Sequence, residues 1–255
     1  MKTLTISCLL FLGFGCGVDE AVLLQNVERD DRVATHYAIH VGGVCSTDYL
    51  VGKGRGVLGE FENVVSVNAR VNQRTTMAAA TSDLRDVLDD YCTGEDWCTV
   101  FTFSNGGALI SRALSFYGDD WNILNVVATA SNEGGSELSR WGRAGEIFTS
   151  CDMLDAVSPT DHRSGWNHHD TAGAIFYMVA GYKCMAPWIQ CLLLPGEDDG
   201  AVAYHSAGGM SDVFSTTELC GDEPRYSNHE VAFCDGFRKT HYQMKNEGVC
   251  QAGGC

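Results

Sequence analysis

The stretch VFTFSNGGALISRAL, residues 100–114, changes character at its centre. Four β-prone residues lead into Ser-Asn-Gly-Gly, and small and apolar residues then continue at helical spacing. The pattern predicts a strand that turns sharply into a helix, with Ser104 at the turn. Such an elbow lifts a serine hydroxyl above the sheet edge, near the N–H groups that begin the helix. Ser104 is therefore a candidate nucleophile, and the alternative is a serine that only caps the helix.

Strands and helices alternate on both sides of this elbow. The predicted strands cover residues 36–43, 63–70, 98–104, 121–131, 174–183, 187–196 and 230–237, and the predicted helices cover residues 75–92 and 105–117. The Gly-, Ser- and Asp-rich middle, residues 132–172, is expected to form loops and short helices. This alternation predicts an α/β fold with a mainly parallel central sheet and helices on both faces. Open sheets of this kind bind ligands at the carboxyl edge of the strands.

Length and charge limit the classes of function. The chain has 255 residues, of which 45% are apolar, and we expect a single domain over residues 33–255. The formal net charge is −16, from 33 acidic and 17 basic residues spread along the chain. Such a surface repels polyanions, so no nucleic-acid partner is expected.

The N-terminus has the layout of an export signal. Residues 1–17 contain one lysine, an apolar run of about ten residues and then small residues, and a polar leader follows at 18–32. The apolar run is too short for a membrane-spanning anchor. Gly-Phe-Gly-Cys at 13–16 resembles a bacterial lipobox, in which Cys16 would carry a lipid. We therefore expect a secreted protein, or a cell-surface or periplasmic lipoprotein whose only membrane contact is that anchor.

Cysteine usage points to disulfides. Twelve cysteines occur, and ten remain after Cys8 and Cys16 of the signal are set aside. An even number in an exported chain predicts up to five disulfides, whose connectivity the sequence leaves open. Three pairs have short spacings: Cys92 with Cys98, Cys184 with Cys191, and Cys250 with Cys255.

No metal or other cofactor is predicted. The ten cysteines contain no C-x-x-C or C-x-x-H pair, which argues against a zinc site. The segment PTDHRSGWNHHD offers potential ligands, but a polar loop of chance composition is the favoured interpretation. These side chains are His162, His168, His169 and Asp170.

A serine nucleophile needs a histidine as base and a carboxylate that orients it, and in this setting they follow in the order Ser, acid, His. Asp199 in LLLPGEDDGAV is the best placed acid, with Glu197 and Asp198 as nearby alternatives. His241 follows the last predicted strand and would lie at the carboxyl edge, so it is the favoured base. His229 would enter that strand from the opposite end and is the fallback.

The reaction also needs N–H donors for a developing oxyanion. Asn105, directly after the serine, offers the first. The second is expected from HVGG at 40–43, whose glycines permit close backbone approach.

At this point the chain resembles the α/β-hydrolases of the bacterial lipase and esterase type, the triacylglycerol lipases, over residues 36–244. TASNEGGSEL at 129–138 resembles their T-P-x-x-G-S-x-x-A segment, and DDGAV at 198–202 resembles their N-D-G-x-V, whose aspartate corresponds to Asp199. His40-Val41-Gly42 resembles their H-G-x oxyanion motif, which implies Gly42 as the donor. The chain departs from the family pattern at Val41, which replaces a glycine, and at Thr102, where G-x-S-x-G has its first glycine.

The resemblance implies a serine hydrolase that cleaves small-molecule or lipid carboxylic esters through an acyl-enzyme. Ser104 would attack, His241 would act as base and then acid, and Asp199 would hold the imidazole. Some of these lipases hold calcium through an aspartate shortly after the histidine, and the sequence after His241 offers none. An acyltransferase with the same residues, and a non-catalytic binding or structural module with this fold, remain alternatives. The oligomeric state is left open.

Overall fold

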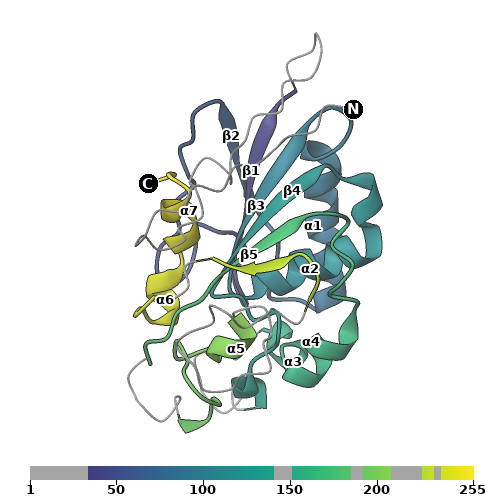
Figure 1. Ribbon diagram of the computed structural model, residues 1–255. Coiled ribbons are helices and arrows are strands. Elements are labelled where there is room, and N and C mark those ends of the chain that lie inside the picture. Colours follow the sequence, from purple (N-terminus) through teal and green to yellow (C-terminus); the bar gives the residue numbers. More distant parts are fainter. Residues whose placement is uncertain (1–33, 141–150, 185–191, 208–225, 233–236) are drawn as a thin grey trace, which may run out of the picture.

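The computed structural model describes residues 34–140, 151–184, 192–207, 226–232 and 237–255 (Figure 1). The predicted signal, Cys16 and the leader lie outside these residues. The strands form one sheet of order β2-β1-β3-β4-β5-β6, and every neighbouring pair is parallel. They are β1 His36–Val41, β2 Val64–Ala69, β3 Trp97–Phe103, β4 Ile123–Thr129, β5 Ile175–Val179 and β6 His229–Val231.

The helices lie on both faces of the sheet and at one of its edges (Figure 1). They are α1 Met77–Tyr91, α2 Asn105–Tyr117, α3 Met153–Ala156, α4 Pro159–Gly165, α5 Tyr204–Ala207, α6 His241–Met244 and α7 Glu247–Gln251, with 3-10 turns η1 Gly118–Asp120 and η2 Glu137–Arg140. The α/β architecture with a parallel sheet, predicted from the alternation of elements, is confirmed. None of the described helices is long and apolar enough to cross a membrane.

One face of the sheet is covered by α1 and α2. Thr76 caps α1 by accepting a hydrogen bond from the N–H of Ala79, and apolar side chains at helical spacing then face inward. Leu84 of α1 and Leu109 of α2 are fully buried in the same cluster as Val100 of β3. This packing fixes α2, and therefore its first turn, against β3.

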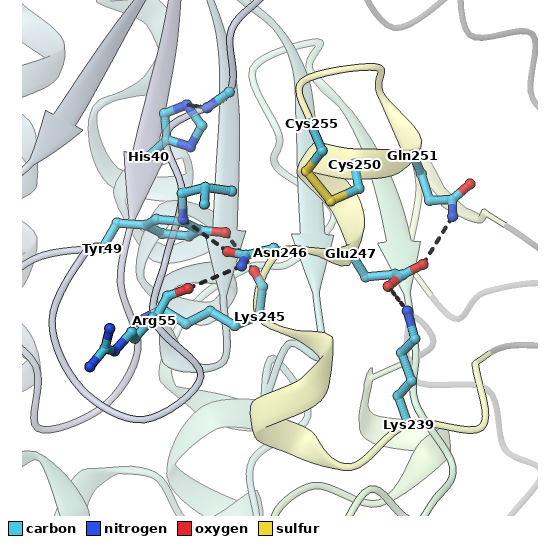
Figure 2. Close-up of a disulfide and its surroundings, with 12 residues drawn as sticks. His40, Tyr49, Arg55, Lys239, Lys245, Asn246, Glu247, Cys250, Gln251 and Cys255 are labelled. Carbon is cyan, nitrogen blue, oxygen red and sulfur yellow. Dashed lines mark hydrogen bonds and ion pairs between the residues drawn. A yellow bond between two sulfur atoms is a disulfide. The ribbon is translucent and has the colours of Figure 1, made fainter.

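The C-terminal helices cover the opposite face. Val249 of α7 packs with Phe101 and Val127, whose side chains leave the sheet on that side. Gly248 brings α7 close to the sheet, because a Cβ there would lie 2.2 Å from Oγ1 of Thr129. The helix also carries the disulfide Cys250–Cys255 and an ion pair between Glu247 and Lys239 (Figure 2).

A clasp of hydrogen bonds joins the α6–α7 segment to the loop after β1 (Figure 2). The hydroxyl of Tyr49 donates to the carbonyl of Lys245 at 2.5 Å. The side chain of Asn246 accepts from the N–H of Val57 and donates to the carbonyl of Arg55, each at 3.0 Å. These contacts connect residues about 190 positions apart and hold the helix that begins at His241.

Three disulfides are described. Cys92–Cys98 and Cys250–Cys255 confirm two of the short-spaced pairs, whereas Cys191 of the third lies outside the described residues. Cys45–Cys151 spans 106 positions; both cysteines were predicted to form disulfides, but the sequence left their partners open. It ties the loop after β1 to the segment that precedes α3.

Two predicted strands differ from the structure. Residues 192–196 of the strand predicted at 187–196 form turns and bends, since Pro195 has no N–H to donate to a sheet and Gly196 has a φ of 71°. The remainder of that segment lies outside the described residues. The last strand, β6, covers only His229–Val231, and Phe237 pairs with Gly181 in an isolated bridge. The short helices expected in the middle of the chain are present as η2, α3 and α4.

Candidate active site

Ser104 lies at the turn between β3 and α2, as the elbow pattern predicted. Its backbone has φ 56° and ψ −126°, a region that non-glycine residues rarely occupy. The N–H of Ser104 donates to the carbonyl of Thr129 at 3.0 Å, which ties the elbow to the end of β4. Such strain persists where the surrounding structure enforces it, and here it aims one hydroxyl away from the strand.

Glycines allow the backbone to pass close to this serine. A Cβ on Gly43 would lie 2.8 Å from the Cβ of Ser104. A Cβ on Gly106 would lie 2.7 Å from the carbonyl oxygens of both Val41 and Gly42. Only glycine fits at these two positions, so the loop after β1 and the first turn of α2 are in close contact around Ser104.

His241 begins α6 and faces the serine hydroxyl. Its Nε2 lies 2.9 Å from Oγ of Ser104, and its ring packs on Phe103 with 4.8 Å between centroids. Thr240 and Gln243 form a capping box at the start of this short helix. The helix and its clasp to the loop after β1 therefore fix the imidazole above the elbow.

Asp199 completes a chain of three side chains. Its Oδ2 lies 2.7 Å from Nδ1 of His241, and its backbone carbonyl accepts the N–H of His241 at 2.8 Å. Its Oδ1 accepts from the N–H groups of Ala201 and Val202 at 2.9 and 2.8 Å. The carboxylate is fully buried, and both oxygens are hydrogen-bonded. Because Nδ1 faces a carboxylate, the neutral imidazole carries its proton there and presents a lone pair to Ser104.

The two alternative acids occupy other positions. Asp198 accepts from the N–H of Gly200 at 2.7 Å and pairs across a short bridge with Ala203. Burial, with the charges of Asp199 and Glu197 as smaller causes, raises the pKa of Asp198 to about 6. Of the three acids, the contact with His241 is made by Asp199.

The predicted oxyanion donors lie on either side of the elbow. Asn105 is the first residue of α2, and the first N–H groups of a helix have no partner within it. Gly42 and Gly43 lie in the loop that touches Ser104 and α2. A buried glutamine, Gln73, hydrogen-bonds to both Asn105 and Gly42. No sequence motif pointed to it.

His40, in the segment that resembles the H-G-x motif, has a packing role. Its ring stacks on Phe101 at 5.2 Å and meets the edge of Tyr49, and its Nε2 accepts from the N–H of Gly59 at 3.4 Å (Figure 2). Burial lowers its pKa to about 3, so the ring is neutral at physiological pH.

His229, the alternative base, lies elsewhere. Its ring stacks on Phe176 with 4.5 Å between centroids, its Nδ1 lies 2.9 Å from the carbonyl of Ser227, and its Nε2 lies 3.1 Å from Oε1 of Glu133. Both ring nitrogens thus face groups other than Ser104. His229 is a buried structural residue.

The prediction of a polar loop of chance composition does not hold for His162, which lies in α4, or for His168, which is buried. His162 is fully buried and His168 nearly so, and Nδ1 of His168 lies 2.9 Å from the same oxygen of Glu133 that faces His229. His169 hydrogen-bonds Ser227 at the surface. The sequence offered no signal for Glu133, which lies in the segment that resembles the lipase T-P-x-x-G-S-x-x-A motif.

Comparisons with known proteins place this geometry in a known fold. No family model and no curated protein matches the chain. A metagenomic carboxyl esterase matches in structure with a TM-score of 0.53 and 16% identity, over 89% of this chain and 78% of that one. The mature Bacillus licheniformis lipase BlEst2 matches with a TM-score of 0.59 and 14% identity, over 87% and 90% of the two chains. The chain thus has the α/β-hydrolase fold of these bacterial esterases and lipases.

Proposed function

We propose that the protein is a serine hydrolase that cleaves carboxylic esters. One observation carries the proposal: Oγ of Ser104, the imidazole of His241 and the carboxylate of Asp199 form an unbroken chain with contacts of 2.9 and 2.7 Å. That chain begins at a strained elbow in a fold shared with a carboxyl esterase and a lipase. A nucleophile, a base and a group that orients the base are the three parts that acyl transfer needs.

The first half of the reaction forms an acyl-enzyme. Nε2 of His241 takes the proton of Ser104 as Oγ attacks the ester carbonyl, and Asp199 stabilises the resulting imidazolium. The tetrahedral intermediate collapses when its bond to the alkoxide oxygen breaks, and Nε2 delivers the proton to that leaving oxygen. An alcohol leaves, and the acyl group remains on Ser104.

The second half restores the enzyme. Nε2 of His241 takes a proton from water, whose oxygen attacks the acyl carbon. Collapse of the second tetrahedral intermediate breaks the bond to Oγ, which regains its proton from His241. A carboxylic acid is released. Asp199 keeps its charge throughout, because its Oδ1 remains bonded to two backbone N–H groups.

The oxyanion of both intermediates would be held by backbone N–H groups. The N–H of Asn105 is one donor, since it begins α2 beside the nucleophile. The loop of Gly42 and Gly43 supplies the other; the family motif implies Gly42, and Gly43 is the residue in contact with Ser104. Fixed dipoles of this kind stabilise charge without reorganising during the reaction.

Action outside the cytoplasm is part of the proposal. Disulfides persist in oxidising compartments, and the structure describes three. The sequence of residues 1–17 has the layout of an export signal. Fractionation of cells that express the full chain, with and without Cys16→Ala, tests both export and the lipid anchor.

The test of the function combines labelling with turnover. Purified oxidised protein is treated with a fluorophosphonate and the labelled peptide is identified by mass spectrometry, while hydrolysis of p-nitrophenyl esters of increasing acyl length is followed. Labelling at Ser104, loss of turnover in Ser104→Ala and His241→Ala, and turnover retained in His229→Ala are expected. A folded protein that neither labels nor hydrolyses any ester would instead be a non-catalytic module. Ester products that appear on adding an alcohol would identify an acyltransferase.

A further inference from the structure

One buried amide side chain joins the two segments that flank the elbow. Gln73 lies between β2 and α1 and is fully buried. Its backbone pairs with the loop after β1: its N–H donates to the carbonyl of Ser46 at 2.9 Å, and its carbonyl accepts the N–H of Cys45 at 3.0 Å. The residue is therefore fixed at both its backbone and its side chain.

The side chain of Gln73 forms a bridge. Its Nε2 donates to the carbonyl oxygen of Gly42, and its Oε1 accepts from Nδ2 of Asn105 at 2.9 Å. A backbone carbonyl only accepts, so the NH₂ group must face Gly42, and the oxygen must then face the NH₂ of Asn105. The contact pattern leaves one consistent orientation for both amides.

We propose that Gln73 is a positioning residue that holds two oxyanion donors, the N–H groups of Gly43 and Asn105, in fixed positions relative to each other. The inference rests on the proposed function, since it concerns the same reaction. A trans peptide is planar, so fixing the carbonyl of Gly42 also fixes the direction of the N–H of Gly43. Holding the Asn105 side chain fixes the first residue of α2, whose own N–H is the other donor. Donors stabilise an oxyanion only when they point at its position, so their relative placement matters.

Other contacts hold each segment separately. The hydroxyl of Ser46 donates to the carbonyl of Gly43 at 2.6 Å, and the disulfide Cys45–Cys151 anchors the same loop. The first turn of α2 is closed by the N–H of Gly107, which donates to the carbonyl of Ser104. Among the side-chain hydrogen bonds of the described residues, the Gln73 amide is the one that links loop and helix directly.

Burial makes this link costly to break. Oδ1 of Asn105 is buried without a hydrogen-bond partner among the described residues. The hydrogen bond from Nδ2 of Asn105 to Gln73 therefore satisfies the other polar group of this side chain. Removing the Gln73 amide leaves the NH₂ of Asn105 unpaired as well. A buried amide without a hydrogen bond is costly, so Asn105 is expected to move toward a new partner. Such a movement would displace the backbone N–H of Asn105, which is one of the two proposed oxyanion donors.

The experiment compares three purified variants with the wild type. Gln73→Met removes both hydrogen bonds at similar volume, and Gln73→Glu keeps an acceptor for Asn105 but presents a carboxylate to the carbonyl of Gly42. Thr81→Val is the control, because it removes a buried hydroxyl of α1 that bonds to Met77 and Arg112, away from Ser104. Turnover is expressed per site titrated with the fluorophosphonate, and Tm is recorded for each.

The expected result is a loss of kcat at nearly unchanged KM. We expect kcat per titrated site to fall about 10- to 100-fold in both Gln73 variants, below the roughly 10²- to 10³-fold loss when a donor is deleted outright. Affinity for a trifluoromethyl ketone, which mimics the tetrahedral intermediate, should fall by the same factor. Thr81→Val should lower Tm and leave kcat per titrated site unchanged.

The pH profile of Gln73→Glu gives a second readout. A buried carboxyl has a raised pKa, and once protonated it can donate to Gly42 while still accepting from Asn105. The ratio of its kcat to that of the wild type should therefore rise as the pH falls. A role in folding alone would not produce that recovery.

The outcomes separate the two proposals. If the wild type hydrolyses esters and labels at Ser104, but the Gln73 variants keep wild-type kcat per titrated site, Gln73 has no positioning role and the proposed function stands. Lower Tm and fewer titratable sites at unchanged kcat overturn the inference in the same way. A folded wild type that neither labels nor hydrolyses overturns both.

Discussion

Two buried groups of carboxylate and histidine lie among the described residues, and they differ in what the second ring nitrogen of the histidine contacts. In the first, Nδ1 of His241 faces Asp199 and Nε2 faces the hydroxyl of Ser104. A hydroxyl both donates and accepts, so the neutral imidazole is satisfied and free to take a proton. In the second, His229 faces Oε1 of Glu133 through one nitrogen and the carbonyl of Ser227 through the other. Two acceptors require two protons, so His229 is held as an imidazolium.

A second histidine, His168, also contacts Glu133. Nε2 of His168 lies 2.9 Å from the carbonyl of His162, and its Nδ1 lies 2.9 Å from Oε1 of Glu133 and 3.3 Å from Oγ of Ser111. Glu133 follows β4, His168 follows α4 and His229 begins β6, so the group joins three distant segments. A buried carboxylate–histidine pair thus presents a nitrogen lone pair to a serine hydroxyl in one place and forms an ion pair that joins distant segments in the other.

Electrostatics supports this distinction. Burial alone would raise the pKa of Glu133, but the charge of His229 and hydrogen bonds from both histidines hold it well below its ordinary value. Burial likewise opposes the charged form of His229, but the charge and hydrogen bond of Glu133 raise its pKa above the ordinary value. The Glu133–His229 pair is therefore ionised near neutral pH.

The sharpest test of the comparison replaces each of the two histidines with alanine in turn. His241→Ala should lower kcat by about 10⁴-fold or more, because the serine loses its base, while Tm changes little. His229→Ala should leave kcat per titrated site near the wild-type value and lower Tm, because Glu133 loses a partner in a buried site. Turnover per folded protein, labelling by the fluorophosphonate and thermal unfolding measure both. Equal losses of kcat in the two variants would break the comparison.

Asp199→Asn tests whether the first acid acts through the tautomer of His241. An amide can donate to Nδ1, which would favour a proton on Nε2 and leave no lone pair for Ser104. We expect kcat to fall by about 10⁴-fold with little change in Tm. Asp198→Asn is the matched control, since that carboxyl does not contact His241 in the described structure. Pre-steady-state kinetics of acylation distinguishes slow attack from slow deacylation.

Glu133→Gln tests the second group directly. An amide of the same shape removes the negative charge that the buried imidazolium of His229 faces, and breaking a buried ion pair costs about 3–5 kcal/mol. Urea unfolding at pH 7 should show this loss. Asp86→Asn, at an exposed position of α1, should change the free energy of unfolding by less than about 1 kcal/mol. A stability for Glu133→Gln that matches this control would show that the ion pair does not anchor the fold.

The pH dependence of stability gives the smallest and most specific signal. The folded pKa of His229 is raised, so its contribution is complete below the unfolded pKa of about 6.5 and is lost as the pH rises through the folded value. The folded pKa of Glu133 is lowered, so its contribution is present above the unfolded pKa of about 4.3 and is lost as the pH falls. Tm measured from pH 3 to 9, a range of roughly six units, should show both losses in the wild type. The difference in Tm between wild type and Glu133→Gln should be largest near neutral pH and should shrink toward both ends of that range.

Much of the fold and part of the site follow from local sequence. The elbow at Ser104 was predictable because β-prone residues, a serine, glycines and helical periodicity occur within fifteen positions. The alternation of strands and helices implied parallel pairing, and short spacing suggested Cys92–Cys98 and Cys250–Cys255. The strand predicted at 187–196 was wrong over residues 192–196, because that prediction gave the apolar residues more weight than Pro195 and Gly196.

What only the tertiary structure decided are contacts between distant positions. His241 rather than His229 meets Asp199, across 42 positions, because α6 is clasped to the loop after β1. Gln73 bridges to Asn105, and Glu133 reaches His229, across 32 and 96 positions. Periodicity and turn chemistry act over a few residues, so the local sequence alone determines the strands, the helices and the elbow at Ser104. Buried polar partners are selected by which chain segments the packed sheet brings together, and that is a property of the whole fold.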